Sequence, residues 1–304
     1  MNPPKVSIIT LNWNGLEDTE ECLASLQTVT YPNYDVIVVD NASTGNDVAV
    51  LREQFGDYAH IIQNDRNRGF AAGNNIGIRH ALENNAEYVF LLNNDTVVDP
   101  AFLDELVRVA ETDQSIGIFC PNIYAYDQPD RLVFTGPIKA DFWRNSIKRQ
   151  PKYDCRGPVI KTEVALGTAM LITRKTIEVI GFLPEEYFFG VEDVDYSLHA
   201  SRAGIGIAIV TTAKVWHKIG RSGSKLNTVA VRHQYMGWQI MRRKYLSTTS
   251  YFLSTATSLI WTTKRSSVQL LHDVRHGNYH DIRVFYRTMR EAIKGLLQGA
   301  NSRD

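Results

Sequence analysis

The chain has 304 residues, of which 44% are hydrophobic and 22% charged, so it can bury a sizeable core, and disorder over most of its length is excluded. Basic and acidic residues number 33 each, but 16 basic and 4 acidic residues follow from Lys214 onward, against 17 and 29 before it, which predicts two surfaces with different partners. The three cysteines lack C-x-x-C or C-x-H spacing, which disfavours a disulfide framework and a zinc site: Cys22, Cys120 and Cys155.

Two segments bear on localisation. Met1 to Lys5 runs into an apolar segment without the charged-then-apolar pattern of a secretory signal. Residues 246–263 carry no charge, but ten of these 18 residues are Ser or Thr, which is too polar for a membrane span. We therefore expect a cytoplasmic protein.

The first half of the chain alternates strand and helix patterns. Short apolar runs at Val6–Leu11 and Asp35–Asp40 predict strands buried on both faces of a parallel sheet, and Leu16–Leu26 between them predicts a crossover helix. The alternation continues, in chain order, with a strand at Ile61-Ile62, a helix over Ala71–Leu82 and a strand over Tyr88–Leu92. This pattern predicts an α/β fold with a Rossmann-like, mostly parallel open sheet flanked by helices.

The second half carries fewer strands and ends in a helical pattern. Further strands are predicted over Ile116–Tyr124, Val164–Ile172 and Ile205–Val210. The stretch Asp127–Pro158, with its Pro and Arg residues, predicts a flexible loop or a subdomain. After about Thr228 the pattern is amphipathic, helical and basic, so we expect a sheet-bearing domain over 1–227 and a basic helical C-terminal extension over 228–304.

Polar residues end three of the predicted strands. T-L-N-W-N-G (10–15) ends the first strand, D-N-A-S (40–43) the second, and N-N-D-T (93–96) the strand from Tyr88. Each alone is more simply a turn or a helix cap. Three on one edge favour a site, because ligands bind at the carboxyl ends of strands in open α/β sheets. A dinucleotide fold and a P-loop are disfavoured, since G-x-G-x-x-G and G-x-x-x-x-G-K are missing.

Five separated motifs occur in order over roughly residues 5–220. They are S-I-I-T-L-N-W-N-G, V-V-D-N-A-S, R-N-R-G-F-A-A-G-N-N, L-L-N-N-D-T and G-F-L-P-E-E-Y-F-F-G-V-E-D-V-D-Y-S-L. Together they resemble the family 2 glycosyltransferases of the glycosyltransferase A fold, and within them the bacterial rhamnosyltransferase-like branch. The resemblance implies an inverting transfer of a sugar from a nucleoside-diphosphate donor to an acceptor hydroxyl.

The resemblance assigns one set of residues to the donor. They would hold the nucleobase and ribose, line the same pocket, or stand at the family's D-x-D position: Thr10, Asn12, Asp40, Arg68, Gly69, Asn74, Asn93 and Asn94. The sequence departs from the strict D-x-D motif because Asn93 replaces the first acid. Asp95 is then the sole carboxylate of that segment.

A departing nucleoside diphosphate develops negative charge, which a divalent cation bridging its phosphates neutralises. Mg²⁺ or Mn²⁺ prefers oxygen ligands and is commonly held by one or two carboxylates plus the phosphates, a role that Asp95 fits. The resemblance adds His217 as a second metal ligand. A lone histidine is otherwise more often a surface or packed residue.

The run G-V-E-D-V-D-Y-S-L leads into a predicted helix. Acids in a first helical turn are also what capping and dipole complementarity favour. An inverting transfer needs one carboxylate to take the acceptor's proton. The resemblance places this base at Asp193, with Glu192 beside it facing the acceptor, and Asp195 is the alternative base.

Gly167, Thr168 and Trp216 complete the expected acceptor side. A glycine within an apolar strand ordinarily weakens the strand or marks a bulge. The resemblance favours the other interpretation of Gly167, in which the missing side chain lets the donor sugar or the acceptor approach.

Basic residues of the C-terminal part lie among aromatic and aliphatic ones: Arg242-Arg243-Lys244, Lys264-Arg265, Arg283, Arg287, Arg290 and Lys294. The last four recur at three- or four-residue steps, along one helical face. A solvated face and peripheral binding to anionic lipid on the inner face of the plasma membrane both fit. Nucleic acid is not an expected partner, because no motif for it is present.

The leading hypothesis is an inverting glycosyltransferase acting on a lipid-linked or polysaccharide acceptor, with dTDP-rhamnose as the donor that the branch resemblance favours. A catalytically silent partner that binds nucleotide sugar or glycan during polysaccharide assembly is the alternative, since the first D-x-D acid is lost. A sugar nucleotidyltransferase is disfavoured because a Gly- and Arg-rich N-terminal phosphate loop is missing.

Overall fold

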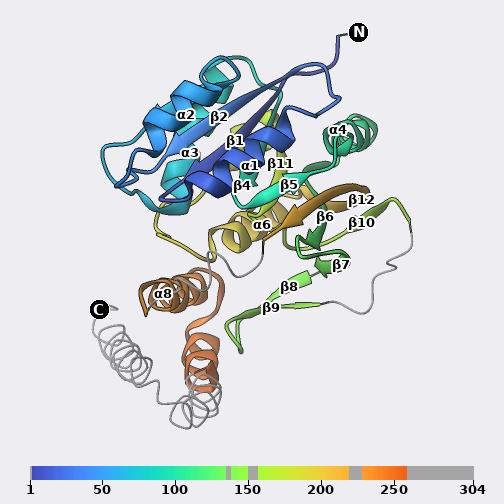
Figure 1. Cartoon of the computed structure of the whole chain (residues 1–304). Coiled ribbons are helices and arrows are strands. Elements are labelled where there is room, and N and C mark those ends of the chain that lie inside the picture. Colours follow the sequence, from blue (N-terminus) through green and yellow to red (C-terminus); the bar gives the residue numbers. More distant parts are fainter. Residues whose placement is uncertain (1, 135–137, 150–156, 219–227, 259–304) are drawn as a thin grey trace. The chain divides into compact units, whose positions relative to one another are not determined.

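The structure, a computed structural model, describes residues 2–134, 138–149, 157–218 and 228–258. The chain divides into two compact units, Met1–Lys139 with Lys148–Lys225, and Ala140–Ile147 with Leu226–Asp304. Its elements up to the end of the first unit are β1 (Val6–Asn12), α1 (Leu16–Leu26), β2 (Tyr34–Asp40), α2 (Asp47–Phe55), β3 (Ala59–Gln63), α3 (Gly69–Glu83), β4 (Tyr88–Asn93), β5 (Thr96–Val98), α4 (Phe102–Thr112), β6 (Ile116–Ala125), β7 (Gln128–Phe134), β8 (Ile138–Asp141), β9 (Ser146–Arg149), β10 (Val159–Lys161), β11 (Ala169–Thr173), α5 (Arg174–Ile180), α6 (Glu192–Arg202) and β12 (Gly206–His217) (Figure 1).

A ten-stranded sheet runs through the first unit in the order β10-β12-β6-β11-β4-β1-β2-β3, with β5 paired to β12 and β7 to β6. The pairs β4-β1, β1-β2 and β2-β3 are parallel, as the strand and helix alternation predicts. The sheet is mixed beyond them, because β11 runs antiparallel to both β4 and β6. Short apolar runs buried on both faces leave strand direction open, so the sequence could not specify this reversal.

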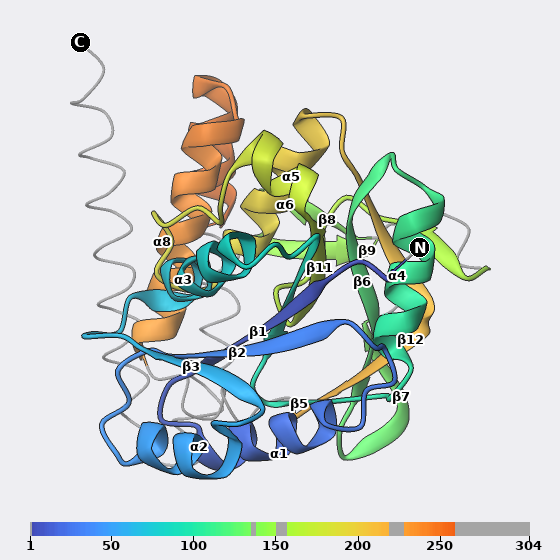
Figure 2. The same ribbon diagram turned by 90° about the horizontal axis from the view of Figure 1, so that it is seen from above.

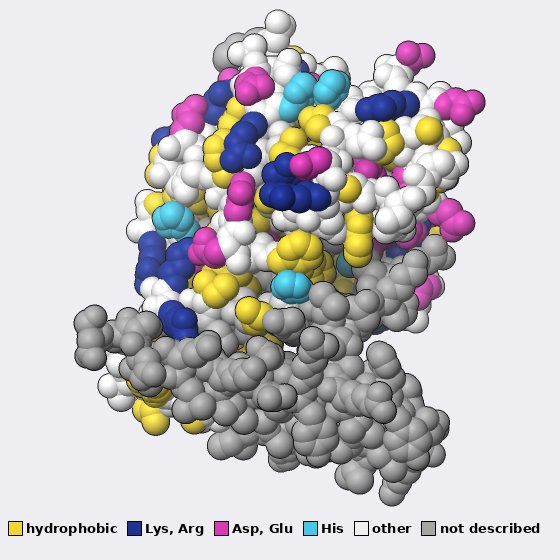
Figure 3. All heavy atoms as spheres, turned by 90° about the vertical axis from the view of Figure 1, so that its left-hand side faces the viewer, with side chains coloured by type: hydrophobic (Ala, Val, Ile, Leu, Met, Phe, Trp, Pro, Cys, Tyr) yellow, Lys and Arg dark blue, Asp and Glu magenta, His cyan; other side chains and the backbone are white. Residues whose placement is uncertain are grey.

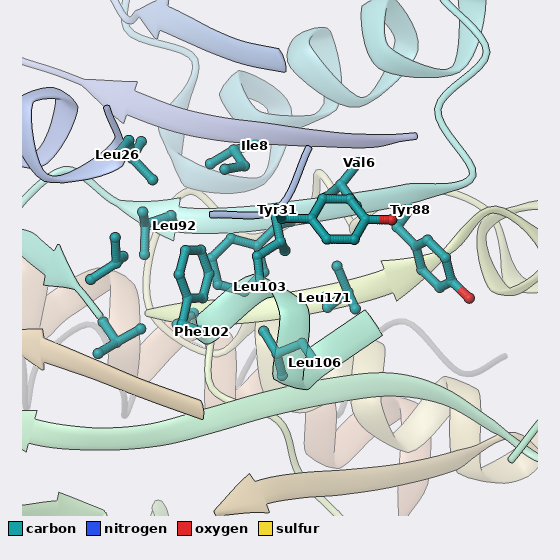
Figure 4. Packing of buried hydrophobic residues seen from close by; sticks show 14 of the residues in the cluster. Val6, Ile8, Leu26, Tyr31, Tyr88, Leu92, Phe102, Leu103, Leu106 and Leu171 are labelled. Atoms are coloured by element: carbon teal, nitrogen blue, oxygen red, sulfur yellow. The ribbon is translucent and has the colours of Figure 1, made fainter. Parts of the chain in front are cut away.

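Successive strand residues face two different cores. Ile8, Val38 and Phe90 belong to a cluster that also holds apolar residues of α1, α2 and α4. Ile9 and Val39 belong to a second cluster, packed with residues of α3, α5 and α6. This alternation puts helices on both faces of the sheet, and Figure 2 shows α1 and α2 on the face opposite α3. In the first cluster Tyr31, Phe102, Leu103, Leu106 and Leu171 pack together (Figure 4).

Two strands differ from their predicted bounds. The strand predicted over Val164–Ile172 begins only at Ala169, because residues before it form a turn in which Ala169 N–H donates to the Leu166 carbonyl. The strand predicted to end at Val210 continues to His217 as β12, with a register shift between Val210 and Lys214. Trp216 and His217 therefore lie within a strand that pairs with β5 and β6, and not in a loop after it.

The described part of the second unit contains α8 (Thr228–Tyr245), a helix over 248–258 and the turn between β8 and β9. Arg242 is fully buried there and donates hydrogen bonds to the Phe142 carbonyl at 2.6 Å and to the Asn145 side chain. Trp238 packs edge-on against Phe142, with ring centroids 6.1 Å apart. These contacts explain why residues 140–147 join this unit, which the expected boundary at 227/228 did not include.

The charge of the C-terminal part can be followed only in its first portion. Arg242, Arg243 and Lys244 end α8, whereas the basic residues predicted from Lys264 to Lys294 lie outside the described residues. On the face shown in Figure 3, described side chains of both signs are interspersed. Among the described residues, no helix is long and apolar enough to cross a membrane.

Candidate active site

Asn12, at the carboxyl end of β1, is the centre of a buried polar cluster. Its Nδ2 lies 2.8 Å from Asp40 Oδ2 and 3.0 Å from Asp47 Oδ2, and 3.1 Å from Ser43 Oγ. Ser43 also closes the turn after β2, since its N–H donates to Asp40 Oδ1 and its hydroxyl to Asp40 Oδ2. The cluster presents two buried carboxylates at one strand edge, where donor groups of a ligand would find acceptors.

Thr10 is not brought into this cluster. It is fully buried two residues before Asn12, and it lies within reach of the Cys22 side chain of α1. Asp47, which the sequence reading did not include, takes a place in the cluster because α2 begins there. Its only sequence signal was a Ser, Thr, Gly, Asn and Asp turn composition that is common at helix starts.

A second buried amide, Asn41, organises the neighbouring loop. Its Oδ1 accepts from Asn64 Nδ2 at 3.1 Å and from the Arg68 N–H at 3.0 Å, and its Nδ2 donates to the Gly69 carbonyl at 3.1 Å. Gly69 has a φ of +81°, and a Cβ there would stand 2.3 Å from the Phe188 carbonyl oxygen. Only glycine fits this close approach, which brings the segment before α6 against the start of α3.

The other predicted donor residues of this loop have local partners. The Arg68 guanidinium pairs with Asp65 at 2.7 Å on the surface. Asn74 is buried and donates to the Phe70 carbonyl at 3.0 Å. Asn75, which the sequence reading did not single out, donates to the Leu183 carbonyl and accepts from the Leu183 N–H.

The segment 93–95 lies at the carboxyl end of β4, whose last residue is Asn93, and its two asparagines are only partly buried. Asn94 turns toward α1, where its Nδ2 donates to Thr19 Oγ1 at 2.9 Å. A Cβ on Gly15 would stand 2.7 Å from the same nitrogen, so Gly15 leaves room for this contact. Thr19 Oγ1 in turn donates to Asn12 Oδ1 at 2.9 Å. The segment and the Asn12 cluster are thus joined through one hydroxyl of α1.

Asp95 lies beside His217. The distance between Asp95 Oδ1 and His217 Nε2 is 3.1 Å, and Asp95 is 3% exposed. β5 and β12 set this pairing, because His217 is in register with Thr96. Carboxylate oxygens suit Mn²⁺, and imidazole nitrogen is a ligand of first-row divalent transition metals. Among the described residues no group of three or more His, Cys, Asp or Glu could hold a metal ion, so these residues supply at most two such ligands at this pair.

Asp193 and Glu192 begin α6 at the same edge of the sheet. Asp193 Oδ2 accepts from the Gly167 N–H at 2.9 Å and Oδ1 from the Val194 N–H at 2.8 Å. Burial raises the pKa of Asp193, although these two hydrogen bonds act in the opposite sense. Burial, together with the charge of Asp193, raises the pKa of Glu192 to about 7.

Gly167 and Thr168 connect the start of α6, which carries Asp193, to the end of β4, which precedes Asp95. While the Gly167 N–H donates to Asp193, the Thr168 carbonyl accepts from the Asn93 N–H at 2.9 Å. A Cβ on Gly167 would be 3.4 Å from the Asp193 Cβ and from the Phe70 ring, which is ordinary contact. A side chain of one carbon would therefore fit at this position, so packing against Asp193 does not by itself require a glycine here.

Two further residues of the expected site have other surroundings. Trp216 Nε1 donates to the Pro129 carbonyl at 3.1 Å, and its ring lies 6.2 Å from that of Tyr124. Asp195 is 1% exposed, within the first turn of α6. Cys22 and Cys120 are free and buried, and Cys155 lies outside the described residues.

Acidic side chains thus gather at one edge of a mixed α/β sheet. The sequence pattern of the family described as "Glycosyl transferase family 2" matches residues 7–179, more than half of the chain. The chain belongs to glycosyltransferase family 2, and it is an enzyme of the glycosyltransferase class.

Curated relatives are glycosyltransferases of bacteria and archaea. The chain is 25% identical over 261 residues to the low-salt glycan biosynthesis hexosyltransferase Agl10 of Haloferax volcanii, covering 85% of this chain and 80% of that protein. It is 25% identical over 196 residues to the dTDP-rhamnosyl transferase RfbF of Shigella flexneri, covering 64% of this chain and 63% of the other.

Solved structures show the same fold. The mannosyltransferase PcManGT of Pyrobaculum calidifontis, in complex with GDP-Man and Mn²⁺, matches with a TM-score of 0.58 and 14% identity over 99% of this chain and 88% of its own. GalNAc-T7 with UDP, GalNAc and Mn²⁺ matches with a TM-score of 0.61 and 16% identity, over 70% of this chain and 43% of its own. The expected glycosyltransferase A fold is confirmed.

Proposed function

We propose that the chain transfers a sugar, with inversion at the anomeric carbon, from a nucleoside-diphosphate sugar to a hydroxyl of a lipid-linked or polysaccharide acceptor. One observation carries the proposal. The Gly167–Thr168 peptide segment is bonded on one side to Asp193 and on the other to Asn93, two residues before Asp95. The two residues Gly167 and Thr168 thus link Asp193, the carboxylate proposed for proton transfer, to the segment of Asp95, the carboxylate proposed for the diphosphate.

Asp193 is the proposed general base. Its raised pKa makes it a better proton acceptor than an ordinary aspartate, while the amide of Gly167 holds one of its oxygens in a fixed direction. It takes the proton from the acceptor hydroxyl as the oxygen attacks the face of the sugar opposite the phosphate. Glu192, whose Oε2 accepts from the Gly190 and Val191 N–H groups, lines the acceptor side.

Asp95 and His217 are the proposed ligands of a divalent cation, Mn²⁺ or Mg²⁺. The buried carboxylate suits either ion, and the imidazole nitrogen beside it favours Mn²⁺, the transition metal of the two. The ion supplies positive charge next to the departing diphosphate. The remaining donor residues of this chain bind and orient the nucleoside, with Asp40 and Asn12 at the centre of the pocket.

Rhamnose from dTDP-rhamnose is the proposed donor, supported by the similarity to a dTDP-rhamnosyl transferase. The similarity to a glycan biosynthesis enzyme supports a role in assembling a cell-envelope polysaccharide. A cytoplasmic location, with peripheral contact between the basic C-terminal part and the inner face of the plasma membrane, belongs to the same proposal.

The test is a thermal-shift screen of UDP, dTDP and GDP and their sugars, with and without Mn²⁺ or Mg²⁺, followed by a transfer assay with the sugar nucleotides that bind. We expect dTDP and dTDP-rhamnose to stabilise the protein most, and only with metal. Stabilisation by GDP-mannose alone, or with no metal added, would contradict the proposed donor or the proposed metal site.

In the Asp95→Ala variant we expect metal-dependent nucleotide binding to be lost, since no other carboxylate stands in the 93–95 segment. Isothermal titration of dTDP with and without Mn²⁺ measures it. The matched control is Asp99→Ala, four residues on and partly buried at the end of β5. If the Asp95 variant kept the metal dependence of the natural chain, the assignment of Asp95 would be wrong.

A further inference from the structure

Next to the Asp95 and His217 pair stands a lysine that the sequence reading did not single out. The Lys218 side chain is 2% exposed, and its Nζ lies 2.6 Å from Asp18 Oδ1 and 2.5 Å from Glu21 Oε2. Both carboxylates belong to the first half of α1. Burial by itself lowers the pKa of a lysine, but the hydrogen bonds to Asp18 and Glu21 outweigh it and raise the pKa of Lys218.

The backbone of Lys218 is hydrogen-bonded to Asp95, one of the two proposed metal ligands. Its N–H donates to the Asp95 carbonyl at 3.0 Å, directly after the pairing of His217 with Thr96. The His217 carbonyl accepts from the Tyr126 N–H at 3.0 Å. Residues 217 and 218 are therefore held by the neighbouring strand ends, while the lysine side chain reaches back to α1.

Tyr126 completes the surroundings of the ammonium group. Lys218 Nζ lies 5.4 Å from the centre of the Tyr126 ring, and the Tyr126 hydroxyl donates to Glu21 Oε1 at 2.5 Å. An ammonium group that lies over an aromatic face and between two carboxylates is held in one position and is kept charged. Such a group resists displacement more than an exposed ion pair does.

α1 thus contacts both chain segments that carry a proposed metal ligand, residues 93–95 and residues 217–218. Through Thr19 it holds Asn94, and Cys22 Sγ lies 3.9 Å from the Asn93 carbonyl oxygen. Through Asp18 and Glu21 it holds Lys218, which follows His217. α1 therefore contacts the sequence neighbours of each proposed metal ligand.

We propose that Lys218 is a positioning residue that fixes His217 relative to Asp95 by tying the end of β12 to Asp18 and Glu21 of α1. This inference rests on the proposed metal site. Groups behind a ligand orient it, and their loss typically weakens metal binding by about 10- to 100-fold. The role predicts an effect on the metal requirement that is separable from folding and from the chemical step.

The variants are Lys218→Met, which keeps the length and apolar stem, and Lys218→Arg, which restores a cation. Lys5→Met is the matched control, because Lys5 also joins a strand end to a carboxylate, Asp35 at 2.7 Å, but near Asn84 and far along β1 from Asn12. The readout is the Mn²⁺ concentration that half-saturates dTDP binding, measured by isothermal titration, beside melting temperature and kcat at saturating Mn²⁺.

We expect Lys218→Met to raise the half-saturating Mn²⁺ concentration about 10-fold or more, with kcat at saturating Mn²⁺ within a few-fold of the natural chain, and Lys218→Arg to recover part of the loss. Lys5→Met should lower the melting temperature without changing the Mn²⁺ requirement. In a chain with Asp18→Asn and Glu21→Gln, adding Lys218→Met should have little further effect, since the three residues act as one unit.

The outcomes separate the two proposals. If the natural chain binds dTDP equally with and without Mn²⁺, the proposed metal site fails and the inference fails with it. If the natural chain needs Mn²⁺ and Lys218→Met has the same half-saturating concentration, only the positioning role of Lys218 is overturned. The positioning role is also overturned if Lys218→Met lowers the melting temperature as much as Lys5→Met does and leaves the Mn²⁺ requirement unchanged.

Discussion

Asn94 and Asp95 are neighbours in sequence with opposite surroundings. Asn94 turns to Thr19 of α1, whereas Asp95 is buried beside His217. The residue types at positions 93–95 predicted a polar strand end, but not which side chain would face the helix. That division depends on Gly15, whose missing side chain leaves room for the Asn94 amide and comes 79 residues earlier.

Asp193→Asn tests the proposed base. Asn keeps the shape and can still accept from the Gly167 N–H, but it cannot take a proton, so single-turnover transfer should slow by about 10² to 10⁴. Donor affinity should barely change, and the melting temperature should fall only slightly, because the Asn amide nitrogen cannot accept from the second of the two N–H groups. Asp195→Asn is the control, and a normal rate in Asp193→Asn with a collapse in Asp195→Asn would move the base to Asp195.

Glu192→Gln should make stability less sensitive to pH. The pKa of Glu192 rises from an ordinary 4.5 to about 7 on folding, so between these values the folded chain holds a proton that the unfolded chain has released. Stability from this group is present at low pH and is lost as pH rises through that window. The melting temperature of Glu192→Gln minus that of the natural chain should therefore increase from pH 5 to pH 8. Exposed Glu178→Gln is the control, and a pH-independent difference for Glu192→Gln would contradict the raised pKa.

At the scale of elements, the local sequence pattern predicts the helices and strands but not the long-range contacts between them, as at the start of α3. The alternation of apolar runs located β1, α1, β2, α3 and β4 within a few residues. α4 also carries apolar residues at helical spacing, from Phe102 to Ala110. Contacts such as Gly69 with Phe188 join residues over 100 apart, and no local pattern carries them.

Gly69→Ala and Gly181→Ala separate backbone strain from contact. Both glycines have a φ of +81°, but a Cβ on Gly181 meets nothing within 4 Å, whereas one on Gly69 meets the Phe188 carbonyl oxygen. Gly181→Ala should cost about 1 to 3 kcal/mol of unfolding free energy for the strained backbone alone. Gly69→Ala should cost more and should also weaken dTDP binding, because the Asn41 loop must shift. Urea denaturation and titration measure both, and equal losses would show that the Phe188 contact has no weight.

At the scale of the whole molecule, both hydrophobic clusters consist entirely of residues from the first unit. The proposed donor, metal and base residues belong to it as well. The strong positive charge of the C-terminal part was readable from composition, whereas the inclusion of residues 140–147 in the second unit was not, since it depends on the buried Arg242.

A chain ending at Lys225 should fold and bind dTDP with Mn²⁺ nearly as the full chain does. Binding to vesicles containing anionic lipid should be lost from this shortened chain, because most of the basic excess lies in the part removed. Circular dichroism, titration and vesicle sedimentation check the three statements. Vesicle binding that survives the truncation would place the membrane contact in the first unit.

The reversed direction of β11 has a consequence for how such enzymes diverge. Because β11 is antiparallel to β4, its amino end meets the carboxyl end of β4, and the chain arriving from β10 delivers Gly167 and Thr168 to Asp193 and Asn93. Material inserted ahead of β11 would therefore change what precedes the proposed base without altering the β1 to β4 half that carries the proposed nucleotide-binding residues. With the proposed assignments, lengthening or replacing the stretch between β6 and β11 should change the acceptor while the donor is kept, and swapping that stretch between relatives would test this.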